Sequence, residues 1–161
     1  MFCVGDKVVY PMYGAGVIEE LEEKLIDGAN QLYYVMNIPV GNLKIMVSAS
    51  KAANLGIREI YESGEVIDIL KNVVNIPINM PENWNERYKS NLSKIKTGKL
   101  SEVVEVYRNL FLREKARGLS SAEKKLLSNA KHIVVGEISL SKNIDKEAAE
   151  NILISEYVRW A

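Results

Sequence analysis

The sequence predicts an α+β protein in which a small β-barrel is followed by a compact α-helical bundle. Short runs of β-forming residues, separated by turns that contain Gly and Pro, fill the first 60 residues. Apolar residues recur at helical spacing from Asn83 onward. Between these parts, Pro77 and Pro81 lack amide donors and restrict the residues before them. We therefore expect a barrel domain at 1–60, a short helix and Pro-containing linker at 61–80, and a helical domain at 81–161.

The predicted strands follow one another with tight turns. The first is Lys7 to Tyr10, which Pro11 closes, and the second covers residues 17–25. Asp27-Gly28 joins it to a third strand at residues 31–38, because Gly supplies the positive φ that a two-residue hairpin turn requires. Four or five short strands in about 60 residues are typical of a small SH3-like or Tudor-like barrel.

The fourth strand follows a turn at Pro39 and Gly41-Asn42. Its residues alternate, so we expect one face to point inward (Leu43, Ile45 and Val47) and the other to carry Lys44 and Met46. An outward Met on an edge strand suits a partner that docks by adding a strand to the sheet, although a lone exposed apolar residue is also common without any function.

The helices are predicted from apolar stripes and end signals. Ser63 is the expected N-cap of a short helix whose stripe ends at Val74. Thr97-Gly98 and Gly118 end the next two helices, and Ser120-Ser-Ala-Glu123 is a capping box that opens the third. Asp145 caps the fourth. The stripes of these four helices are Trp84, Tyr88, Leu92, Ile95; Val103, Val106, Tyr107, Leu110, Phe111; Leu126, Leu127, Ala130, Ile133, Val134; and Ala149, Ile152, Leu153, Tyr157, Trp160.

The charge is zero overall but unevenly distributed. The 161 residues carry 21 basic and 21 acidic side chains. Residues 1–80 have a balance of −4 and residues 81–161 a balance of +4, while the stretch from Arg87 to Lys131 alone has +8. This pattern excludes a histone-like basic coat. The asymmetry indicates either contact of one half with nucleic acid or a membrane, or solvated helix faces.

The chemistry-bearing residues do not form a catalytic or cofactor motif. The chain has one histidine, one cysteine, and no HExxH, CxxC, GxxxxGK[ST] or GxGxxG pattern. We therefore expect a binding protein that is not an enzyme and needs no cofactor and no metal. A single cysteine allows no internal disulfide, and neither a secretory signal nor an apolar run of about 18–20 residues is present. These features favour a cytoplasmic protein without membrane contact.

Basic residues surround an aromatic residue in the helix that starts near Asn83. Arg87 and Lys94 flank the stripe on one side, and Lys89 and Lys96 on the other. Such a face suits phosphate contact with base stacking, but it equally suits a core stripe with snorkelling lysines. Helical periodicity by itself favours a core position for Trp84. Lys124 and Lys131 form a second basic strip on a later helix.

Three spaced motifs resemble the CarD/CdnL family of bacterial transcription regulators. They are Val4-Gly-Asp-Lys-Val-Val-Tyr-Pro-Met-Tyr-Gly-Ala-Gly-Val, Pro81-Glu-Asn-Trp-Asn-Glu-Arg-Tyr-Lys-Ser-Asn-Leu, and Arg117-Gly-Leu-Ser-Ser-Ala-Glu-Lys-Lys-Leu-Leu followed by Val135-Gly-Glu. The resemblance covers essentially the whole chain. It implies a Tudor-like domain that binds the RNA polymerase β subunit, related to a module of transcription-repair coupling factors. It also implies a helical domain that contacts promoter DNA without sequence specificity, near the upstream fork at the −10 region.

The resemblance also assigns residues. Trp84 matches the family's tryptophan wedge, which packs against splayed bases and hinders collapse of the melted bubble, so the resemblance moves this residue out of the core. Arg87, Lys89 and Lys124 match basic positions used for DNA backbone contact. Glu86 occupies a site that is often basic in the family, and Asn129 replaces a lysine seen in some members. DNA affinity is therefore expected either to be weaker or to be carried by Lys125 and Lys131 instead. Lys24 and Met46 fall where some relatives have arginines, and they form with Lys44 the expected polymerase-binding set.

These observations together predict a monomeric, cytoplasmic transcription regulator that is associated with the nucleoid through RNA polymerase. Its barrel binds the polymerase β subunit, and its helices stabilise the promoter open complex through Trp84 and the basic residues. The alternative is an adaptor that binds polymerase or a repair factor and never contacts DNA.

Overall fold

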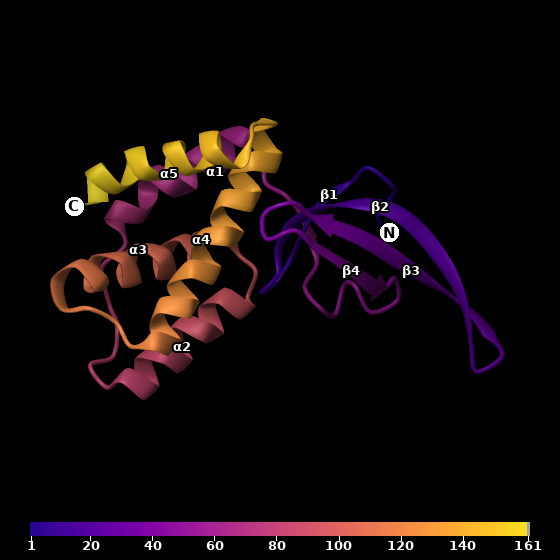
Figure 1. Cartoon of the computed structure of the whole chain (residues 1–161), viewed down its shortest axis with the longest axis horizontal. Helices are drawn as coiled ribbons and strands as arrows, with labels where there is room; N and C mark the ends of the chain where they lie inside the picture. The colour runs from indigo at the N-terminus through magenta and orange to yellow at the C-terminus, as the bar shows by residue number, and fades with distance from the viewer. Residues whose placement is uncertain (161) are drawn as a thin grey trace.

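The computed structural model describes residues 1–160, and the side chains of residues 1–156. The sheet and the helices lie at opposite ends of an elongated molecule (Figure 1). The α+β prediction, with the sheet first and the helices second, is confirmed. Tyr157 and Trp160, which we expected on an apolar stripe, lie outside the described side chains.

Five antiparallel strands form the sheet in the order β4-β3-β2-β1-β5. They are β1 (Lys7–Tyr10), β2 (Gly14–Ile26), β3 (Ala29–Ile38), β4 (Leu43–Ser48) and β5 (Arg58–Glu59). The edge strands β4 and β5 do not pair with each other, so the sheet is open rather than closed into a barrel. Its own small core contains Val8, Ile18, Tyr34, Met36, Ile38, Val47, Ala52 and Ile57.

The turn between β2 and β3 has the predicted chemistry. Asp27 and Gly28 have φ values of 51° and 79°, as a two-residue hairpin turn requires. The tip of this hairpin pairs only with itself, because β1 pairs with β2 no further than Val17 and β4 pairs with β3 from Tyr33 onward. The hairpin therefore protrudes from the sheet (Figure 1), and Leu25 near its tip is exposed.

The helices are α1 (Ser63–Asn72), α2 (Trp84–Lys96), α3 (Leu100–Arg117), α4 (Ser121–Lys142) and α5 (Lys146–Trp160), with a 3-10 turn at Val73–Asn75. The stop at Gly118 and the capping box of Ser120 and Glu123 are confirmed. Asp145 accepts a hydrogen bond from the N–H of Ala148 at 2.8 Å, as a cap should. A single apolar core joins α1 to the other helices through Val66, Leu70 and Val73.

Three details differ from the predictions. Glu62, not Ser63, is the N-cap of α1, and no side chain caps the helix there. Val74 is exposed because the chain leaves the helix at Val73 and tightens into the 3-10 turn. Leu43 is exposed although it continues the inward alternation, because it is the first residue of an edge strand and pairs with Ile38 at the end of β3. Among the described residues, no helix is long and apolar enough to cross a membrane.

Helix α4 connects the helices to the sheet. It packs on β2, and a Cβ at its Gly136 would lie in ordinary van der Waals contact with the Cβ atom of Ala15, at 3.7 Å. Arg58 of β5 donates two hydrogen bonds to the carboxylate of Glu137, at 2.8 and 2.9 Å, and this fully buried carboxylate also accepts from the Tyr61 N–H. The Lys7 ammonium donates to the Leu140 carbonyl at 2.8 Å, near the end of α4. We call the Arg58–Glu137 pair the interdomain ion pair.

Candidate functional site

Trp84 is the first residue of α2, and its side chain is 52% exposed. At 100° per residue it lies on the same side of the helix as the buried residues Asn91 and Ile95. However, Cα–Cβ bonds tilt toward the helix N-terminus, so a residue in the first position extends past the end of the bundle. The core position that periodicity favours is therefore wrong, and the exposure implied by the family resemblance is correct.

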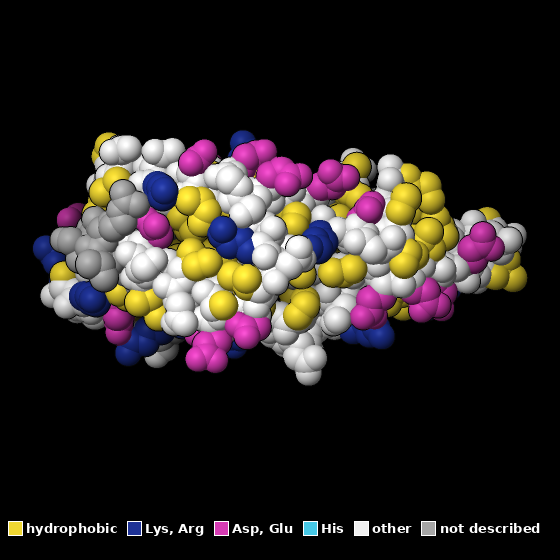
Figure 2. All heavy atoms as spheres, turned by 90° about the horizontal axis from the view of Figure 1, so that it is seen from above, with side chains coloured by type: hydrophobic (Ala, Val, Ile, Leu, Met, Phe, Trp, Pro, Cys, Tyr) yellow, Lys and Arg dark blue, Asp and Glu magenta, His cyan; other side chains and the backbone are white. Residues whose placement is uncertain are grey.

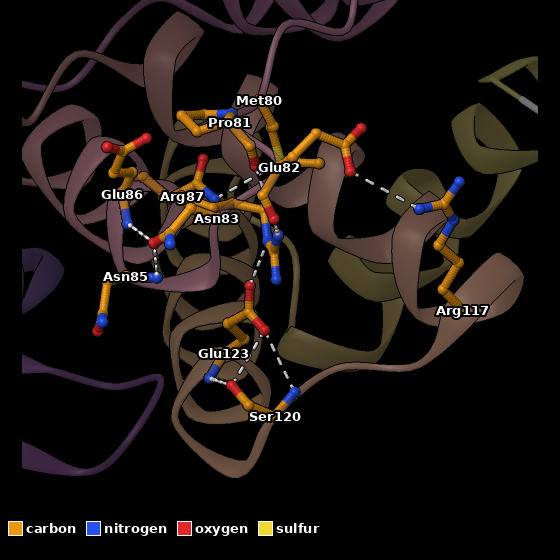
Figure 3. Close-up of polar contacts among 11 residues, drawn as sticks. Met80, Pro81, Glu82, Asn83, Asn85, Glu86, Arg87, Arg117, Ser120 and Glu123 are labelled. Carbon is orange, nitrogen blue, oxygen red and sulfur yellow. Dashed lines mark hydrogen bonds and ion pairs between the residues drawn. The ribbon is translucent and has the colours of Figure 1, made fainter.

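The start of α2 is well defined. Asn83 is its N-cap, and its side-chain oxygen accepts hydrogen bonds from the N–H groups of Asn85 and Glu86 at 3.0 and 3.2 Å (Figure 3). These bonds satisfy two of the amides that a helix start leaves without partners. The backbone that carries Trp84 is consequently held in place immediately beside the exposed indole.

Arg87, expected to contact DNA, lies instead in a buried ion pair. Its side chain is 4% exposed, and its Nε donates to the Glu123 carboxylate at 2.6 Å. The same guanidinium donates to the carbonyl of Glu82 at 2.9 Å (Figure 3). Because its charge is already neutralised inside the protein, we leave Arg87 out of the DNA-contacting set and treat it as a positioning residue.

Glu123 joins this ion pair to the start of α4. Its carboxylate accepts from the N–H and the hydroxyl of Ser120, and the Ser120 hydroxyl accepts from the Glu123 N–H (Figure 3). Burial raises the pKa of Glu123, but the hydrogen bonds from Arg87 and Ser120 outweigh it, so the pKa is below its ordinary value of 4.5. Glu123 therefore stays ionised near neutral pH and fixes the starts of α2 and α4 to each other.

The predicted lysines lie on α2 and α4, the two helices that meet at this junction. Lys89 on α2, and Lys124 and Lys125 on α4, are exposed, while Lys131 is half-buried almost two turns further along α4. Lys125 lines a shallow groove with Tyr88 of α2, so the structure brings the two basic helices together. We call Lys89, Lys124, Lys125 and Lys131 the basic set.

The two residues that depart from the family pattern lie beside the basic set. Glu86 is exposed in the first turn of α2 and reduces the local positive charge. Asn129 donates to the Met12 carbonyl at 3.3 Å and so joins α4 to the turn after β1. Asn129 therefore contributes a hydrogen bond between α4 and the sheet, in place of the positive charge that some relatives have here.

The polymerase-binding candidates fall on two parts of the sheet. Lys44 and Met46 lie together on edge strand β4, where Lys44 is 3.2 Å from Glu19 and Met46 is 41% exposed. The exposed Leu43 adds a second apolar side chain to this edge. Lys24 lies on the protruding hairpin, with its ammonium 5.8 Å from the centroid of the Tyr33 ring. Lys24 pairs with Gln31 of β3, and Met46 pairs with Val35 of the same strand. Gln31 and Val35 are four residues apart, so the two candidates are separated by about 13 Å along the sheet.

Charge is distributed along the molecule as the sequence indicated. Figure 2 shows acidic side chains along the sheet end, out to the hairpin, whereas at the helical end Lys and Arg side chains are interspersed with acidic ones. Among the described residues, no group of three or more His, Cys, Asp or Glu side chains is placed to hold a metal ion. The arrangement presents an exposed indole, a basic set and an open sheet edge.

Sequence reasoning missed two acidic residues that position these surfaces. Glu123 was visible as part of a capping box, but nothing in the local pattern indicated that its carboxylate also binds Arg87. Glu137 stood in the Val135-Gly-Glu motif and is an acidic residue among apolar ones in a helix, a placement that indicates a buried partner, but nothing in the pattern indicated Arg58 as that partner.

Comparison with known proteins covers almost the whole chain. Residues 2–61 match the family model described as the CarD-like/TRCF RID domain, and residues 65–154 match that of the CarD C-terminal domain. A protein of Bacillus subtilis (strain 168), described as "Putative transcription factor YdeB", is 37% identical over 151 residues, which cover 91% of this chain and 96% of that protein.

Proposed function

Because the chain belongs to the CarD family of transcription regulators, we propose that its sheet binds the β subunit of RNA polymerase and that its helices stabilise the promoter open complex. The observation that carries the proposal is the position of Trp84. This large aromatic side chain is half exposed at the start of α2, and a buried ion pair holds the first turn of the same helix.

Trp84 acts as a wedge at the upstream fork of the melted DNA. Proteins that insert apolar side chains between bases offset an unstacking cost of a few kcal/mol with new contacts. At a fork the bases are already unstacked, so the indole stacks on them without that cost. The wedge therefore binds the open complex more tightly than the closed one, and only this difference in affinity shifts the equilibrium between them.

The basic set supplies contact with the DNA backbone. Lysines are point charges that bind phosphates without reading sequence. Four such residues release a small number of counterions, and Glu86 reduces the local charge. DNA binding by the free protein is accordingly weak, and attachment to polymerase raises the local concentration of the wedge at the promoter.

Edge strand β4 is the proposed contact with polymerase. An edge strand has backbone N–H and C=O groups without partners on one side, and an extended segment of another protein can pair with them. Met46 and Leu43 give this edge apolar contacts, and Lys44 gives it a charge.

Replacing Trp84 tests the proposal. In a competitor-challenge assay with RNA polymerase and a linear promoter, Trp84→Ala is expected to shorten the open-complex lifetime that the protein confers by about 5-fold or more, since base–aromatic stacking contributes about 1–3 kcal/mol. Trp84→Phe is expected to restore part of the effect. Val74→Ala, which also truncates a half-exposed apolar side chain, is the control and is expected to change nothing.

The alternative adaptor makes the opposite prediction. If Trp84→Ala retains polymerase binding in a pull-down and leaves the open-complex lifetime unchanged, the wedge is refuted and a protein-only adaptor remains. If Trp84→Ala abolishes polymerase binding as well, the assignment of separate surfaces is wrong.

A further inference from the structure

The shallow groove between α2 and α4 is open to solvent. Tyr88 and Leu92 line it from α2, and Lys125 and Asn129 line it from α4. Met12, in the turn between β1 and β2, adds an apolar side chain. The volume is about 480 Å³, within the roughly 300–1,000 Å³ of small-ligand sites, so it accommodates a group the size of a nucleotide. We call it the α2–α4 groove.

The walls of the groove are held together by polar contacts. The buried pair of Arg87 and Glu123 joins α2 to the start of α4. Asn129 of α4 donates to the Met12 carbonyl at 3.3 Å, which ties the third wall to the second. The groove therefore exists before anything binds in it, and a ligand has little protein to order there.

The groove begins one helical turn from Trp84. Tyr88 follows Trp84 by four residues on the same side of α2, a spacing that puts their Cβ atoms about 5–6 Å apart. Trp84 is half exposed, and Tyr88 is half-buried, with its ring packed on the helical core and lining the groove. A DNA strand with one base against Trp84 thus has a neighbouring nucleotide within reach of Tyr88.

The charge of the groove suits a polyanion that carries flat apolar groups. Lys125 is exposed in the lining, and the exposed Lys89 is the residue next to Tyr88. Among the described residues, no acidic side chain lines the groove. An aromatic ring in a positively charged groove is the combination by which proteins bind single-stranded nucleic acid, whatever its sequence. The amide of Asn129 can both donate and accept, so it adapts to the edge of any base.

We propose that the α2–α4 groove takes one unpaired base of the DNA strand that Trp84 contacts. The base stacks on Tyr88, and Lys125 and Lys89 contact the phosphates on either side of it. This inference rests on the proposed function, because the groove meets unpaired DNA only when the helices lie at the melted fork. The protein then holds two unpaired nucleotides, one at the wedge and one in the groove.

Titration of the full chain carrying Trp84→Ala, followed by NMR of the Tyr88 ring, tests the groove apart from the wedge. The two probes are a tetranucleotide of thymidine and a tetranucleotide of abasic sites with the same phosphates. Because the indole is absent, a preference for the probe with bases reports on the groove alone. The thymidine probe is expected to bind at least about fivefold more tightly than the abasic one, as stacking of one base on an aromatic ring provides.

Further variants make the result specific. In the same background, Tyr88→Phe keeps the ring and is expected to retain the preference, while Tyr88→Leu is expected to lose it. Ala122→Leu fills the groove from an exposed position of α4, so it is expected to remove the preference without disturbing the core. Ala116→Leu makes the same change on an exposed position of α3 outside the lining and is the control. With polymerase and a promoter, Ala122→Leu alone is expected to shorten the open-complex lifetime about fivefold, and Ala116→Leu to leave it unchanged.

The proposal is overturned if the abasic probe binds as tightly as the thymidine probe, since the groove then contacts phosphates alone. It is also overturned if the thymidine probe shifts no resonance of Tyr88, or if Ala122→Leu keeps the preference. Loss of polymerase binding by Ala122→Leu in a pull-down would instead make the groove a contact for a protein segment. A failure of the wedge is a different result, an open-complex lifetime that Trp84→Ala leaves unchanged, so the two failures are distinguishable.

Discussion

At the scale of single residues, the pair of Arg87 and Glu123 holds the first turn of α2, the helix that begins with Trp84, against the start of α4. Both side chains are almost fully buried, and each has further hydrogen bonds, from Ser120 to Glu123 and from Arg87 to the carbonyl of Glu82. Removing one member of such a pair leaves an uncompensated charge inside the protein. The pair therefore links stability to the orientation of the proposed wedge.

Substitution of Arg87 by Ala is expected to lower the free energy of unfolding by about 3–5 kcal/mol and Tm by about 10 °C. Thermal unfolding followed by circular dichroism measures both. Lys124→Ala is the control, because it removes only an exposed contact with Glu114 at 4.0 Å, which contributes about 0–1 kcal/mol. Equal destabilisation by the two variants would contradict the burial of the pair.

Stability should also depend on pH through Glu123. Its pKa is lower in the folded state than the ordinary 4.5, so its ionised form stabilises the protein above that pH, and this contribution is lost as the pH falls below it. Urea titrations at several pH values should therefore show Glu123→Gln far less stable than the natural chain near pH 7 and closer to it near pH 3. A constant difference across this range would exclude the ion pair as the cause.

Local sequence patterns were informative for backbone features and less so for side-chain partners. Asp27-Gly28, Gly118 and the Ser120 capping box each depend on a few adjacent residues, and all three were predicted. The burial of Arg87 depends on a residue 36 positions away, which no local pattern specifies. Its spacing from Trp84 placed it correctly on the helix but could not distinguish a solvated face from a buried one.

At the scale of elements, β4 is the strand with an open edge and exposed apolar residues. Helical stripes and strand alternation predicted nearly every element, but an edge strand cannot be recognised from alternation, because sheet order is a property of the fold. The prediction of a barrel also depended on sheet order, which the alternation of residues does not specify. Closure requires β4 and β5 to pair, and the two-residue β5 pairs only with β1.

Substitution of Met46 by Glu is expected to reduce binding to RNA polymerase at least about tenfold in a quantitative pull-down, because it places a charge on the proposed contact. The fold should be retained, since Met46 is already exposed. Ile154→Glu makes the same change on an exposed position of α5 and is expected to bind normally. If both variants bind equally well, β4 is not the contact.

At the scale of the whole molecule, the sheet and the helices are held together by the interdomain ion pair and by the packing of α4 on β2. The carboxylate of Glu137 is completely buried and accepts three hydrogen bonds from the sheet side. This contact links the sheet, whose edge β4 is the proposed polymerase contact, to the helices that carry Trp84.

Substitution of Glu137 by Ala is expected to loosen the angle between the sheet and the helices. Spin labels on the exposed Cys3, the sole cysteine of the chain, and on Ile154→Cys should report a narrow distance distribution in the natural protein and a broader one in the variant. Glu105→Ala removes an ion pair with Lys94 that lies entirely within the helices, so it is the control and should leave the distribution narrow. An unchanged distribution in Glu137→Ala would show that packing alone sets the angle.

Under the proposed function, the interdomain ion pair has a consequence for the kind of promoter that can respond. A flexible linker would let the wedge search a volume, and its effective concentration would fall smoothly with distance. A fixed angle would instead place the indole at one position relative to the polymerase, so that it reaches almost no other position nearby. On this view the protein discriminates among promoters by the position of the DNA fork and by the rotation of the DNA helix at that point. It needs no contact with base edges to do so.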